Sequence, residues 1–470
     1  MGYDYMSEVQ SEVQSLIEKA KKAQQQIEFW SQEQVDEAVA AVGWQLVKEE
    51  HVEACAKLAY EETQMGDYEH KVAKISKKTM GTLRDLHGLR TVGVVEHDEV
   101  RGIKKYAKPV GVIGALTPCT NPTATLCTNG LPAIKTRNAI IFSPHPRAKQ
   151  CATLTADYMR AGLREVGAPE DLVQVISEPS IEKTEELMAA ADLVVATGGG
   201  PMVKAAYSSG TPAFGVGPGN ATVIIDETAD IRDAAQKSFL SKTFDNATSC
   251  SSDNNNIIHE GVYRQFVAEL KTLGGYLCSA EEKEKLKETM WPDGVHLNPK
   301  IIAQPAETIS GLAGIQVPDG TAFLMVEGEG PAANDLFGRE KLSVVITLWK
   351  YSDFTADAIR LLNEITTESG YGHSCGIHSF NEDHIDELAT AAHVSRMMVR
   401  QVQCFGNSGA FDNGMPVALT LGCGTWGNNA TSSNVDWTHF VNHTWVSTPI
   451  PPVEPDPEEI FGAHWAKYGQ

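Results

Sequence analysis

The alternation of short apolar runs with helical segments between residues 110 and 209 constrains the fold of this chain more than any other feature. Short apolar strands that alternate with helices indicate a parallel sheet covered by helices on both faces. Ligands of such sheets bind beyond the carboxyl ends of the strands. We therefore expect an α/β fold with a ligand site at one edge of this sheet. The expected strands are 110–116, 139–143, 172–176 and 193–196, and the expected helices are 124–134, 148–166, 181–190 and 201–209.

The segments on either side of this run have other patterns. Residues 7–63 have apolar residues at helical spacing, with Ser31 as an N-cap. Residues 91–99 and 102–108 have strand composition around a polar turn, which predicts a hairpin. A second α/β run begins after about residue 236, and the tail from Thr431 ends in a proline-rich stretch that we expect to be a packing arm. In the second run we expect strands at 256–259, 344–349, 376–379 and 397–402 and helices at 263–273 and 356–365.

Composition excludes several classes of partner. The net charge of −22 argues against nucleic acid, because phosphate binding needs a basic surface. No segment approaches the roughly 18 apolar residues of a membrane span, and the polar N-terminal residues do not resemble a signal peptide. The nine cysteines form no C-x-x-C pair and no metal-ligand spacing, which predicts reduced thiols, no metal site and a cytoplasmic protein.

Cys250 is the strongest candidate for a chemical role. It lies in Phe244-Asp-Asn-Ala-Thr-Ser-Cys-Ser-Ser252, among small polar residues. Most free cysteines are small core hydrophobes, but the polar neighbours of Cys250 disfavour that alternative. The sequence therefore predicts a nucleophile whose chemistry passes through a thioester.

Two strand-end segments are candidates for phosphate or ribose binding. In Ala196-Thr-Gly-Gly-Gly-Pro201 the small residues would allow backbone N–H groups to approach a phosphate, although a structural tight turn is an equal alternative. Phe142-Ser-Pro-His-Pro-Arg-Ala-Lys149 also links a strand to a helix and carries two cations. Its alternative is a capped helix with solvated charges.

Two further side chains are candidates for catalysis. Asn121, in Thr117-Pro-Cys-Thr-Asn-Pro122, would donate its amide to a developing oxyanion, and the alternative is an Asx-turn. His373, between a glycine loop and a strand, would act as an acid or base near neutral pH. For His373 the alternative is a structural histidine.

Taken in order, these motifs resemble the CoA-acylating branch of the aldehyde dehydrogenase superfamily, over about residues 10–460. The most specific pieces are Phe244-Asp-Asn…Cys250, Ser143-Pro-His-Pro146, Gly372-His…His378-Ser379 and Leu421-Gly-Cys-Gly-Thr-Trp-Gly427. The resemblance implies a Rossmann-type cofactor domain, an α/β catalytic domain and a small β oligomerisation arm. The implied bounds are 1–90 and 109–235 for the dinucleotide-binding domain, 236–430 for the catalytic domain, and 91–108 and 431–470 for the hairpin and C-terminal arm.

The same resemblance implies roles for individual residues. Cys250 is the nucleophile, Asn121 and the backbone N–H of Cys250 form the oxyanion hole, and His373 is the acid or base. Arg400, Arg396 and Trp426 are the implied substrate-binding residues. The implied contacts of NAD or NADP are Thr117, Pro118, Ser143, Pro144, His145, Pro146, Thr197, Gly198, Gly199, Gly217 and Glu340.

One departure from the family pattern bears on the reaction. Where hydrolytic relatives have Glu-Leu-Gly-Gly, this chain has Val216-Gly-Pro-Gly219, so the carboxylate that would activate water is absent. The resemblance therefore implies an acylating enzyme that passes the acyl group to CoA. A hydrolytic aldehyde dehydrogenase and a structural protein without catalysis are the weaker alternatives.

The segments around Cys250 and at 210–215 are most similar to acylating sulfoacetaldehyde dehydrogenases, and next to acylating succinate-semialdehyde dehydrogenases. Acylating acetaldehyde dehydrogenase is a further alternative. Arg400 would pair with a sulfonate or carboxylate of the substrate, and a solvated or interface arginine is the alternative for it. Arg147 would meet the 2′-phosphate of NADP. The family also implies a homodimer or homotetramer.

Overall fold

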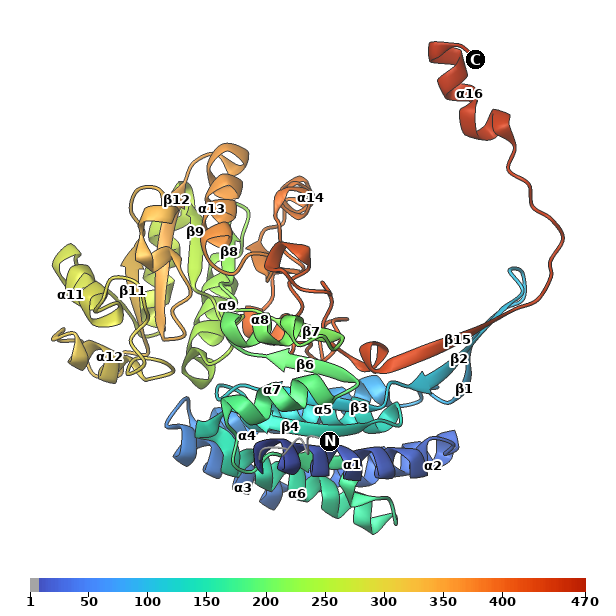
Figure 1. The fold of residues 1–470 in the computed structure, drawn as a ribbon. Coiled ribbons are helices and arrows are strands. Elements are labelled where there is room, and N and C mark those ends of the chain that lie inside the picture. Colours follow the sequence, from blue (N-terminus) through green and yellow to red (C-terminus); the bar gives the residue numbers. More distant parts are fainter. Residues whose placement is uncertain (1–7) are drawn as a thin grey trace, which may run out of the picture.

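The computed structural model describes residues 8–470. Residues 1–7, with which the expected first domain and helical segment begin, lie outside the described residues. The described chain forms two parallel α/β layers and a small antiparallel sheet that extends from them (Figure 1). The expectation of an α/β fold with parallel sheets is confirmed.

The first layer is a five-stranded parallel sheet in the order β5-β4-β3-β6-β7. Its strands are β3 (Val112–Thr117), β4 (Ala139–Pro144), β5 (Val173–Val175), β6 (Leu193–Thr197) and β7 (Ala213–Val216). From β3 the chain adds β4 and then β5 on one side; it then returns to the other side of β3 and adds β6 and β7. Such a reversal leaves a crevice at the carboxyl ends of β3 and β6, where dinucleotides bind in doubly wound folds.

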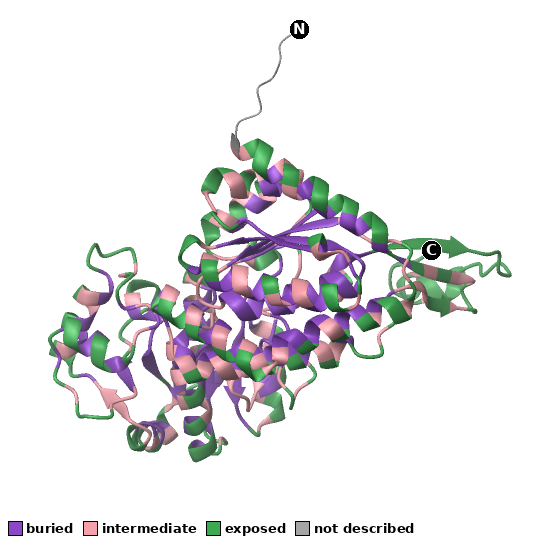
Figure 2. Ribbon diagram, turned by 90° about the horizontal axis from the view of Figure 1, so that it is seen from below, coloured by how far each residue is buried: buried purple, intermediate pink, exposed green. Residues whose placement is uncertain are grey.

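Helices cover both faces of this sheet. Figure 2 shows its strands buried between helices whose outer faces are exposed. These helices are α1 (Glu8–Ile27), α2 (Gln32–Val47), α3 (Glu49–Thr63), α4 (Tyr68–Leu86), α5 (Pro122–Lys135), α6 (Lys149–Glu165), α7 (Ile181–Ala190) and α8 (Gly200–Ser208). Ser31 caps α2 in a capping box with Gln34, as its position predicts.

The second layer is a seven-stranded parallel sheet in the order β10-β11-β12-β9-β8-β13-β14. Its strands are β8 (Thr222–Ile225), β9 (Asn255–His259), β10 (Gly275–Leu277), β11 (Phe323–Glu327), β12 (Val345–Tyr351), β13 (Cys375–His378) and β14 (Met397–Val399). Its helices are α9 (Ile231–Thr243), α10 (Glu260–Thr272), α11 (Ala280–Met290), α12 (Ala306–Leu312), α13 (Arg360–Glu368), which a π-helical turn (Phe354–Ile359) precedes, α14 (Glu382–Ala391) and α15 (Gln403–Gly406).

One expected domain bound differs from the sheet topology. A boundary at 235/236 would leave β8 with the first layer, but β8 pairs with β9 and β13 in the second sheet. The chain changes sheets between Val216 and Thr222, within the glycine-rich segment that follows β7. The other bounds of the domain division stay predictions.

The third sheet contains the expected hairpin. Strands β1 (Gly93–Asp98) and β2 (Ile103–Pro109) are antiparallel, and β15 (Val441–Ser447) pairs along β2. An extended proline-rich segment then leads to α16 (Pro457–Tyr468), which stands away from the rest of the chain (Figure 1). Among the described residues, no helix combines the length and apolar character needed to cross a membrane.

Candidate active site

The residues expected to contact a dinucleotide gather at the carboxyl ends of neighbouring strands. Thr117 at the end of β3 lies opposite Pro144 at the end of β4, and Thr197 at the end of β6 lies opposite Val216 at the end of β7. Pro118 follows β3 and Gly217 follows β7 directly. The parallel register therefore places these side chains along one edge of the sheet.

The turn after β4 is built as its sequence predicts. Ser143 is buried and its hydroxyl lies 2.8 Å from that of Thr184. The backbone N–H of His145 donates to the carbonyl of Thr117 at 3.0 Å, which ties the β4 turn to the end of β3. Pro146 begins a short 3₁₀ turn, and the ring Nδ1 of His145 caps it by accepting from the N–H of the following residue at 3.1 Å. The capped-helix alternative is thus compatible with a binding role.

The glycine turn after β6 leaves room for a phosphate. Gly199 is the N-cap residue of α8, whose first-turn N–H groups point toward the same edge of the sheet. A Cβ at Gly198 would lie 2.9 Å from the sulfur of Met202, whereas a Cβ at Gly217 would meet no atom within 4 Å. The hydroxyl of Thr117 is buried there without a hydrogen-bond partner. An open edge, an unpaired hydroxyl and a helix N-terminus fit a dinucleotide.

The segment that leads to Cys250 has an unusual backbone. Asp245, Asn246 and Ala247 have φ values of 50°, 48° and 61°, so three successive residues with side chains adopt the left-handed region. That region costs an L-residue roughly 1–2 kcal/mol. Strain of this kind persists where surrounding contacts determine the conformation, and it is common at active sites. Here the contacts come from the start of α4: the N–H of Asp245 donates to His70 Nδ1 at 3.0 Å, and the Asn246 amide donates to the carbonyl of Gly66 at 2.9 Å.

Cys250 lies against His373. The sulfur of Cys250 is 3.2 Å from Nε2 of His373, and Nδ1 of His373 is 2.8 Å from the hydroxyl of Ser374. Gly219 closes this pair, because a Cβ there would lie 2.0 Å from the carbonyl oxygen of Cys250 and 3.0 Å from Cε1 of His373. The tertiary structure thus brings together two residues separated by 123 positions. A thiol in contact with an imidazole can transfer its proton directly.

Burial keeps the groups around this thiol neutral. It raises the pKa of the Cys250 thiol to about 12, with a smaller contribution from the Glu340 carboxylate. It lowers the pKa of His373 to about 3, and the Arg396 guanidinium lowers it further. Burial also raises the pKa of Glu340 to about 8, against the opposing effect of the Gly219 N–H. At pH 7 the unliganded site therefore holds a thiol, a neutral imidazole and a mostly protonated carboxyl.

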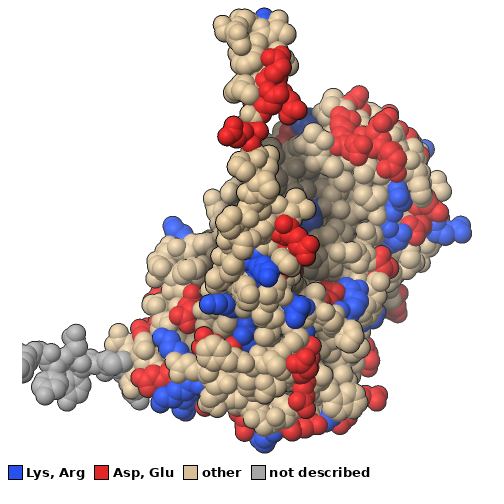
Figure 3. Space-filling model, turned by 90° about the vertical axis from the view of Figure 1, so that its right-hand side faces the viewer, with Lys and Arg blue, Asp and Glu red and all other residues tan. Residues whose placement is uncertain are grey.

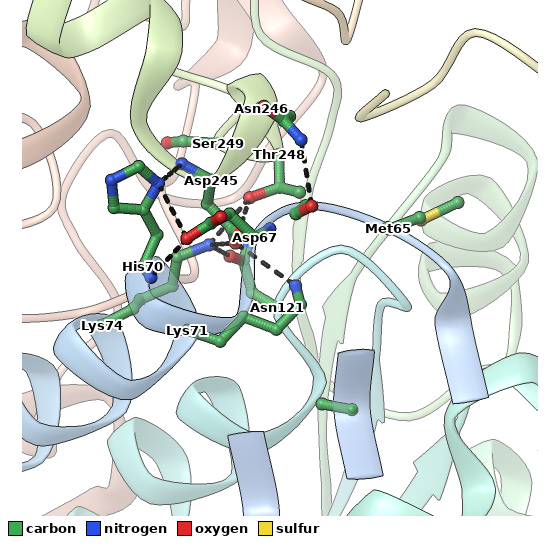
Figure 4. A network of polar contacts seen from close by, with 12 residues as sticks. Met65, Asp67, His70, Lys71, Lys74, Asn121, Asp245, Asn246, Thr248 and Ser249 are labelled. Carbon is green, nitrogen blue, oxygen red and sulfur yellow. Dashed lines mark hydrogen bonds and ion pairs between the residues drawn. The ribbon is translucent and has the colours of Figure 1, made fainter. Parts of the chain in front are cut away.

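Asn121 does not form the Asx-turn that its local sequence allows. It is the N-cap residue of α5, but its side chain makes no cap hydrogen bond. Its oxygen Oδ1 instead accepts from the Lys74 ammonium at 2.7 Å. Figure 4 shows Lys74 within a network that also contains Asp245 and Thr248, from the segment leading to Cys250.

A cavity of about 460 Å³ opens beside Asn121 and Ser249, the residue before Cys250. Its lining includes Phe244, Phe405 and Phe411. Five cations line it as well, together with a single carboxylate, that of Asp412; the cations are Lys74, Lys77, Lys78, Lys237 and Arg400. Burial lowers the pKa of Lys78 to about 7, and Lys74 and Lys237 are paired with Asp245 and Asp233. Lys77 and Arg400 therefore provide most of the positive charge that favours an anionic ligand in this cavity, in a chain with net charge −22.

The two arginines expected to bind substrate differ. Arg400 lines the cavity; its guanidinium lies 4.6 Å over the ring of Phe380, and Nη1 donates to the carbonyl of Ser379 at 2.5 Å. Arg396 is buried, and its Nη atoms donate to three backbone carbonyls, among them that of His373 at 3.0 Å. Arg396 thus supports the His373 segment, and its role in substrate binding stays a prediction. The position of Arg396 in the sequence does not by itself reveal these backbone contacts.

Trp426 is also placed differently from the expectation. It lies in a short 3₁₀ turn (Thr425–Gly427), its ring packs 5.7 Å from that of His393, and it is absent from the lining of the cationic cavity.

Three residues near the site were not expected from the sequence, namely Lys71, Lys74 and Asp245. A signal was present, because Lys71, Lys74 and Lys78 follow each other at helical spacing on the face of α4 that also carries Ile75.

Comparison with known proteins shows the family of the chain. The profile of the aldehyde dehydrogenase family matches residues 3–277. A sulfoacetaldehyde dehydrogenase of Acholeplasma sp is 52% identical over 95% of this chain and 93% of its own length. An acylating sulfoacetaldehyde dehydrogenase of Bilophila wadsworthia is 48% identical over 97% of this chain and 99% of its own.

Solved structures of related enzymes have a similar fold. The crystal structure of an acetylating aldehyde dehydrogenase from Geobacillus thermoglucosidasius has a TM-score of 0.91 and 36% identity, and it covers 95% of this chain and 98% of its own. A propionaldehyde dehydrogenase of Rhodopseudomonas palustris, solved with bound CoA and an acylated cysteine, has a TM-score of 0.83 and 27% identity over 93% and 97% of the two chains. The chain therefore belongs to the aldehyde dehydrogenase family.

Proposed function

We propose that this protein is a CoA-acylating aldehyde dehydrogenase that converts a short anionic aldehyde, CoA and NAD(P)⁺ into an acyl-CoA and NAD(P)H. The observation that carries the proposal is the contact of Cys250 with His373 at 3.2 Å, beside a segment, Val216–Gly219, that contains no carboxylate. A thiol can form the thioester, and nothing in that segment would activate water to hydrolyse it.

The first half of the reaction forms an acyl-enzyme. His373 Nε2 takes the proton of the Cys250 thiol, and the sulfur attacks the aldehyde carbon. The resulting oxyanion accepts hydrogen bonds from the Asn121 amide and the backbone N–H of Cys250. Hydride then leaves the carbon, and an acyl thioester remains on Cys250. The residues at the carboxyl ends of β3, β4, β6 and β7, together with Glu340, would hold NAD(P)⁺, which would accept this hydride.

The second half passes the acyl group to CoA. His373 first releases to solvent the proton that it took from Cys250. The CoA thiol then loses its proton to His373 and attacks the thioester, and the Cys250 sulfur leaves and recovers that second proton. One thioester bond forms as another breaks, so the reaction is reversible. Glu340 is the carboxyl near Cys250, and with a pKa of about 8 it is mostly protonated at pH 7. A protonated carboxyl does not accept a proton from water, which favours the thiol acceptor.

Sulfoacetaldehyde is the first candidate substrate and succinate semialdehyde the second. Both curated relatives described above are sulfoacetaldehyde dehydrogenases. The cationic cavity supports an anionic aldehyde of either kind. Within it, Lys78 already donates to the backbone carbonyls of Ser408 and Gly409 and to the Ser408 hydroxyl. Within the described part of the chain, the Arg400 guanidinium donates one hydrogen bond, so it is the cation we assign to the sulfonate or carboxylate.

We propose that the protein assembles with further copies of itself through the arm formed by β15 and α16. Six of the seven residues of β15 are exposed, and α16 exposes Ile460, Phe461 and Tyr468. In Figure 3 the α16 end of the arm stands above the rest of the molecule and carries uncharged atoms beside a group of acidic residues. Exposed apolar side chains on an extended strand are typical of a surface that pairs with another chain. Sedimentation of the full chain and of a chain ending at residue 440 tests this, and equal masses would contradict it.

An aldehyde panel tests the activity and the substrate class. Sulfoacetaldehyde, succinate semialdehyde, acetaldehyde and butyraldehyde are each followed by NAD(P)H absorbance with NAD⁺ or NADP⁺, with and without CoA. We expect turnover to require CoA and to favour the two anionic aldehydes. Full turnover without CoA would establish hydrolysis instead, and a preference for neutral aldehydes would contradict the anionic substrate. Arg147 gives no ground for NADP, because its Nη2 donates to the carbonyl of Thr63 at 2.5 Å.

A further inference from the structure

Lys74 connects two parts of the site that are far apart in sequence. Its ammonium donates to Oδ1 of Asn121 at 2.7 Å, to the hydroxyl of Thr248 at 2.7 Å and to the carboxylate of Asp245. A lysine ammonium has three N–H donors, so all three are occupied. The side chain is 8% exposed, so water does not substitute for these partners. Lys74 is therefore held rigidly in place (Figure 4).

The contact with Asn121 sets the direction of its amide. An ammonium donates and cannot accept, so the amide atom it contacts must be the oxygen. The NH₂ group is then the opposite arm of the same planar amide and is free to donate elsewhere. Because Asn121 makes no cap hydrogen bond with α5, Lys74 is the contact that decides which arm faces which way. An oxyanion needs a donor, and a flipped amide would present an oxygen to it.

The other two contacts of Lys74 hold the segment that carries Cys250. Asp245 is fully buried, and its carboxylate also accepts from the Thr248 hydroxyl at 2.8 Å and from the backbone N–H of Asp67 at 2.8 Å. Asp245 begins the three left-handed residues, and Thr248 stands two positions before Cys250. The ion that orients the Asn121 amide thus also anchors the backbone that supplies the second oxyanion donor.

Lys71 provides a comparison within the same network. Its ammonium lies 3.3 Å from the Asp245 carboxylate and is likewise buried, at 5% exposure, but no contact joins it to Asn121. Two ammonium groups face one carboxylate, which leaves a net positive charge beside the amide. Lys71 and Lys74 therefore share the ion pair and differ in the contact with Asn121.

We propose that Lys74 is a positioning residue of the oxyanion hole, which orients the Asn121 amide and fixes the Cys250 segment in one step. The inference depends on the proposed role of Asn121 and Cys250 in acyl transfer. It goes beyond that role because it assigns a function to a residue of α4 whose ammonium contacts Asn121, Asp245 and Thr248.

The test compares Lys74→Met with Lys71→Met, alone and combined with Asn121→Ala. Removing one oxyanion donor typically costs about 10²–10³ in kcat. We expect Lys74→Met to lower kcat by about 10²-fold with KM changed less than about threefold, because the effect is on the transition state. We expect Lys71→Met to lower kcat less than about fivefold, with a similar drop in melting temperature for both variants. In the Asn121→Ala background, Lys74→Met should cost less than about threefold more.

Acyl transfer from 4-nitrophenyl acetate separates this inference from the proposed function. Release of 4-nitrophenolate needs the Cys250 thiol and an oxyanion hole but neither CoA nor NAD(P)⁺, so it reports on the hole even if the natural reaction proves to be different. Equal losses of kcat in Lys74→Met and Lys71→Met would overturn the proposal. A Lys74→Met loss that stays near 10²-fold in the Asn121→Ala background would overturn it as well, because Lys74 would then act independently of the amide.

Discussion

The two sides of Cys250 treat charge in opposite ways. Toward His373 and Glu340, burial drives the groups to their neutral forms, with pKa values of about 3 and about 8. Toward α4, the charges remain: burial alone would raise the pKa of Asp245, but the ammonium groups of Lys74 and Lys71 hold it below its usual value. The difference is one of pairing, since a buried ion persists only where opposite charge and hydrogen bonds replace water.

This contrast separates two tasks. The paired ions near α4 form a fixed frame, in which all three N–H donors of Lys74 have acceptors and no proton needs to move. The neutral groups around the thiol are the ones that exchange protons during the reaction. A group whose charge is not locked by a partner can change its protonation state at lower cost. The experiments below test whether the contrast holds, beginning with the largest expected effect.

The reactivity of the Cys250 thiol tests the neutral side directly. A pKa of about 12, against 9.0 for an ordinary thiol, lowers the thiolate fraction at pH 7 by about 10³-fold. We expect iodoacetamide to label Cys250 in the unliganded protein about 10³ times more slowly than it labels N-acetylcysteine. The rate should rise about tenfold per pH unit between pH 7 and pH 10. Mass spectrometry of the Cys250 peptide measures it, with Cys250→Ala as the blank.

The direction in which the labelling rate changes with pH distinguishes a neutral thiol from an ion pair. Because the pKa is raised, the thiol stays protonated across the neutral range and the thiolate increases steadily as pH rises. A thiolate–imidazolium pair with His373 would instead give rapid labelling that is flat from pH 6 to pH 8. That result would show that both sides of Cys250 hold paired ions.

The imidazole is the next group to test. Removal of a general acid or base typically costs 10²–10⁴ in rate, and we expect His373→Gln to lower CoA-dependent kcat by about 10²-fold. His378→Gln is the matched control, because His378 is also buried and has a pKa lowered to about 4, but it is not in contact with Cys250. Steady-state rates and melting temperatures of both variants measure the effect. Equal losses would indicate a structural role for both histidines.

Arg400 tests whether the positive charge of the cavity also serves the substrate. A hydrogen bond to a charged group is worth about 1.5–3 kcal/mol, so we expect Arg400→Met to lower kcat/KM for sulfoacetaldehyde by about 10–100-fold. The value for butyraldehyde should change less than about threefold. Lys77→Met removes an exposed cation of the same cavity and should affect both aldehydes little. A parallel loss for both aldehydes in Arg400→Met would remove the basis for an anionic subsite at this residue.

The smallest expected effect concerns the strained backbone at Ala247, which lies near the paired ions of α4. Ala247 and Ala234 are both fully buried, but Ala247 has a φ of 61° and Ala234 lies inside α9. Glycine relieves the left-handed strain in the first case and weakens the helix in the second. We expect Ala247→Gly to change the free energy of unfolding by less than about 1 kcal/mol, and Ala234→Gly to lower it by about 2 kcal/mol. Denaturant unfolding measures both, and equal losses would show that the left-handed segment stores no strain.

Local patterns predicted much of the fold. Four of the five strands of the first sheet and the hairpin were expected from apolar runs and a polar turn, and the aldehyde dehydrogenase resemblance is confirmed by the family comparison. Strands β7, β8, β10, β11 and β15 were missed. The first three have only three or four residues, β11 lies in a stretch without a clear alternation, and β15 lies in the tail that was expected only to be a packing arm. The change of sheet between β7 and β8 was also missed, since nothing in five linking residues shows that the chain crosses to another layer.

The candidate site was predicted only in part. Cys250, Asn121 and His373 were found because their residue types are chemically distinctive where they stand. Arg396 and Arg400 were not distinguished, although the structure separates a buried support from a cavity residue. The only signal for Lys74 was its helical spacing from Lys71 and Lys78, and a row of lysines on a helix is usually a solvated face.

By itself, the sequence determined the alternating α/β layers and the order of the motifs that contain the nucleophile, because periodicity and residue chemistry are local properties. Only the tertiary structure decided that Lys74 joins Asn121, 47 positions away, to Asp245, 171 positions away. It also decided that His373 reaches Cys250 across 123 positions. The physical reason is that the protonation and direction of a buried polar group depend on which partners the fold places around it in the absence of water.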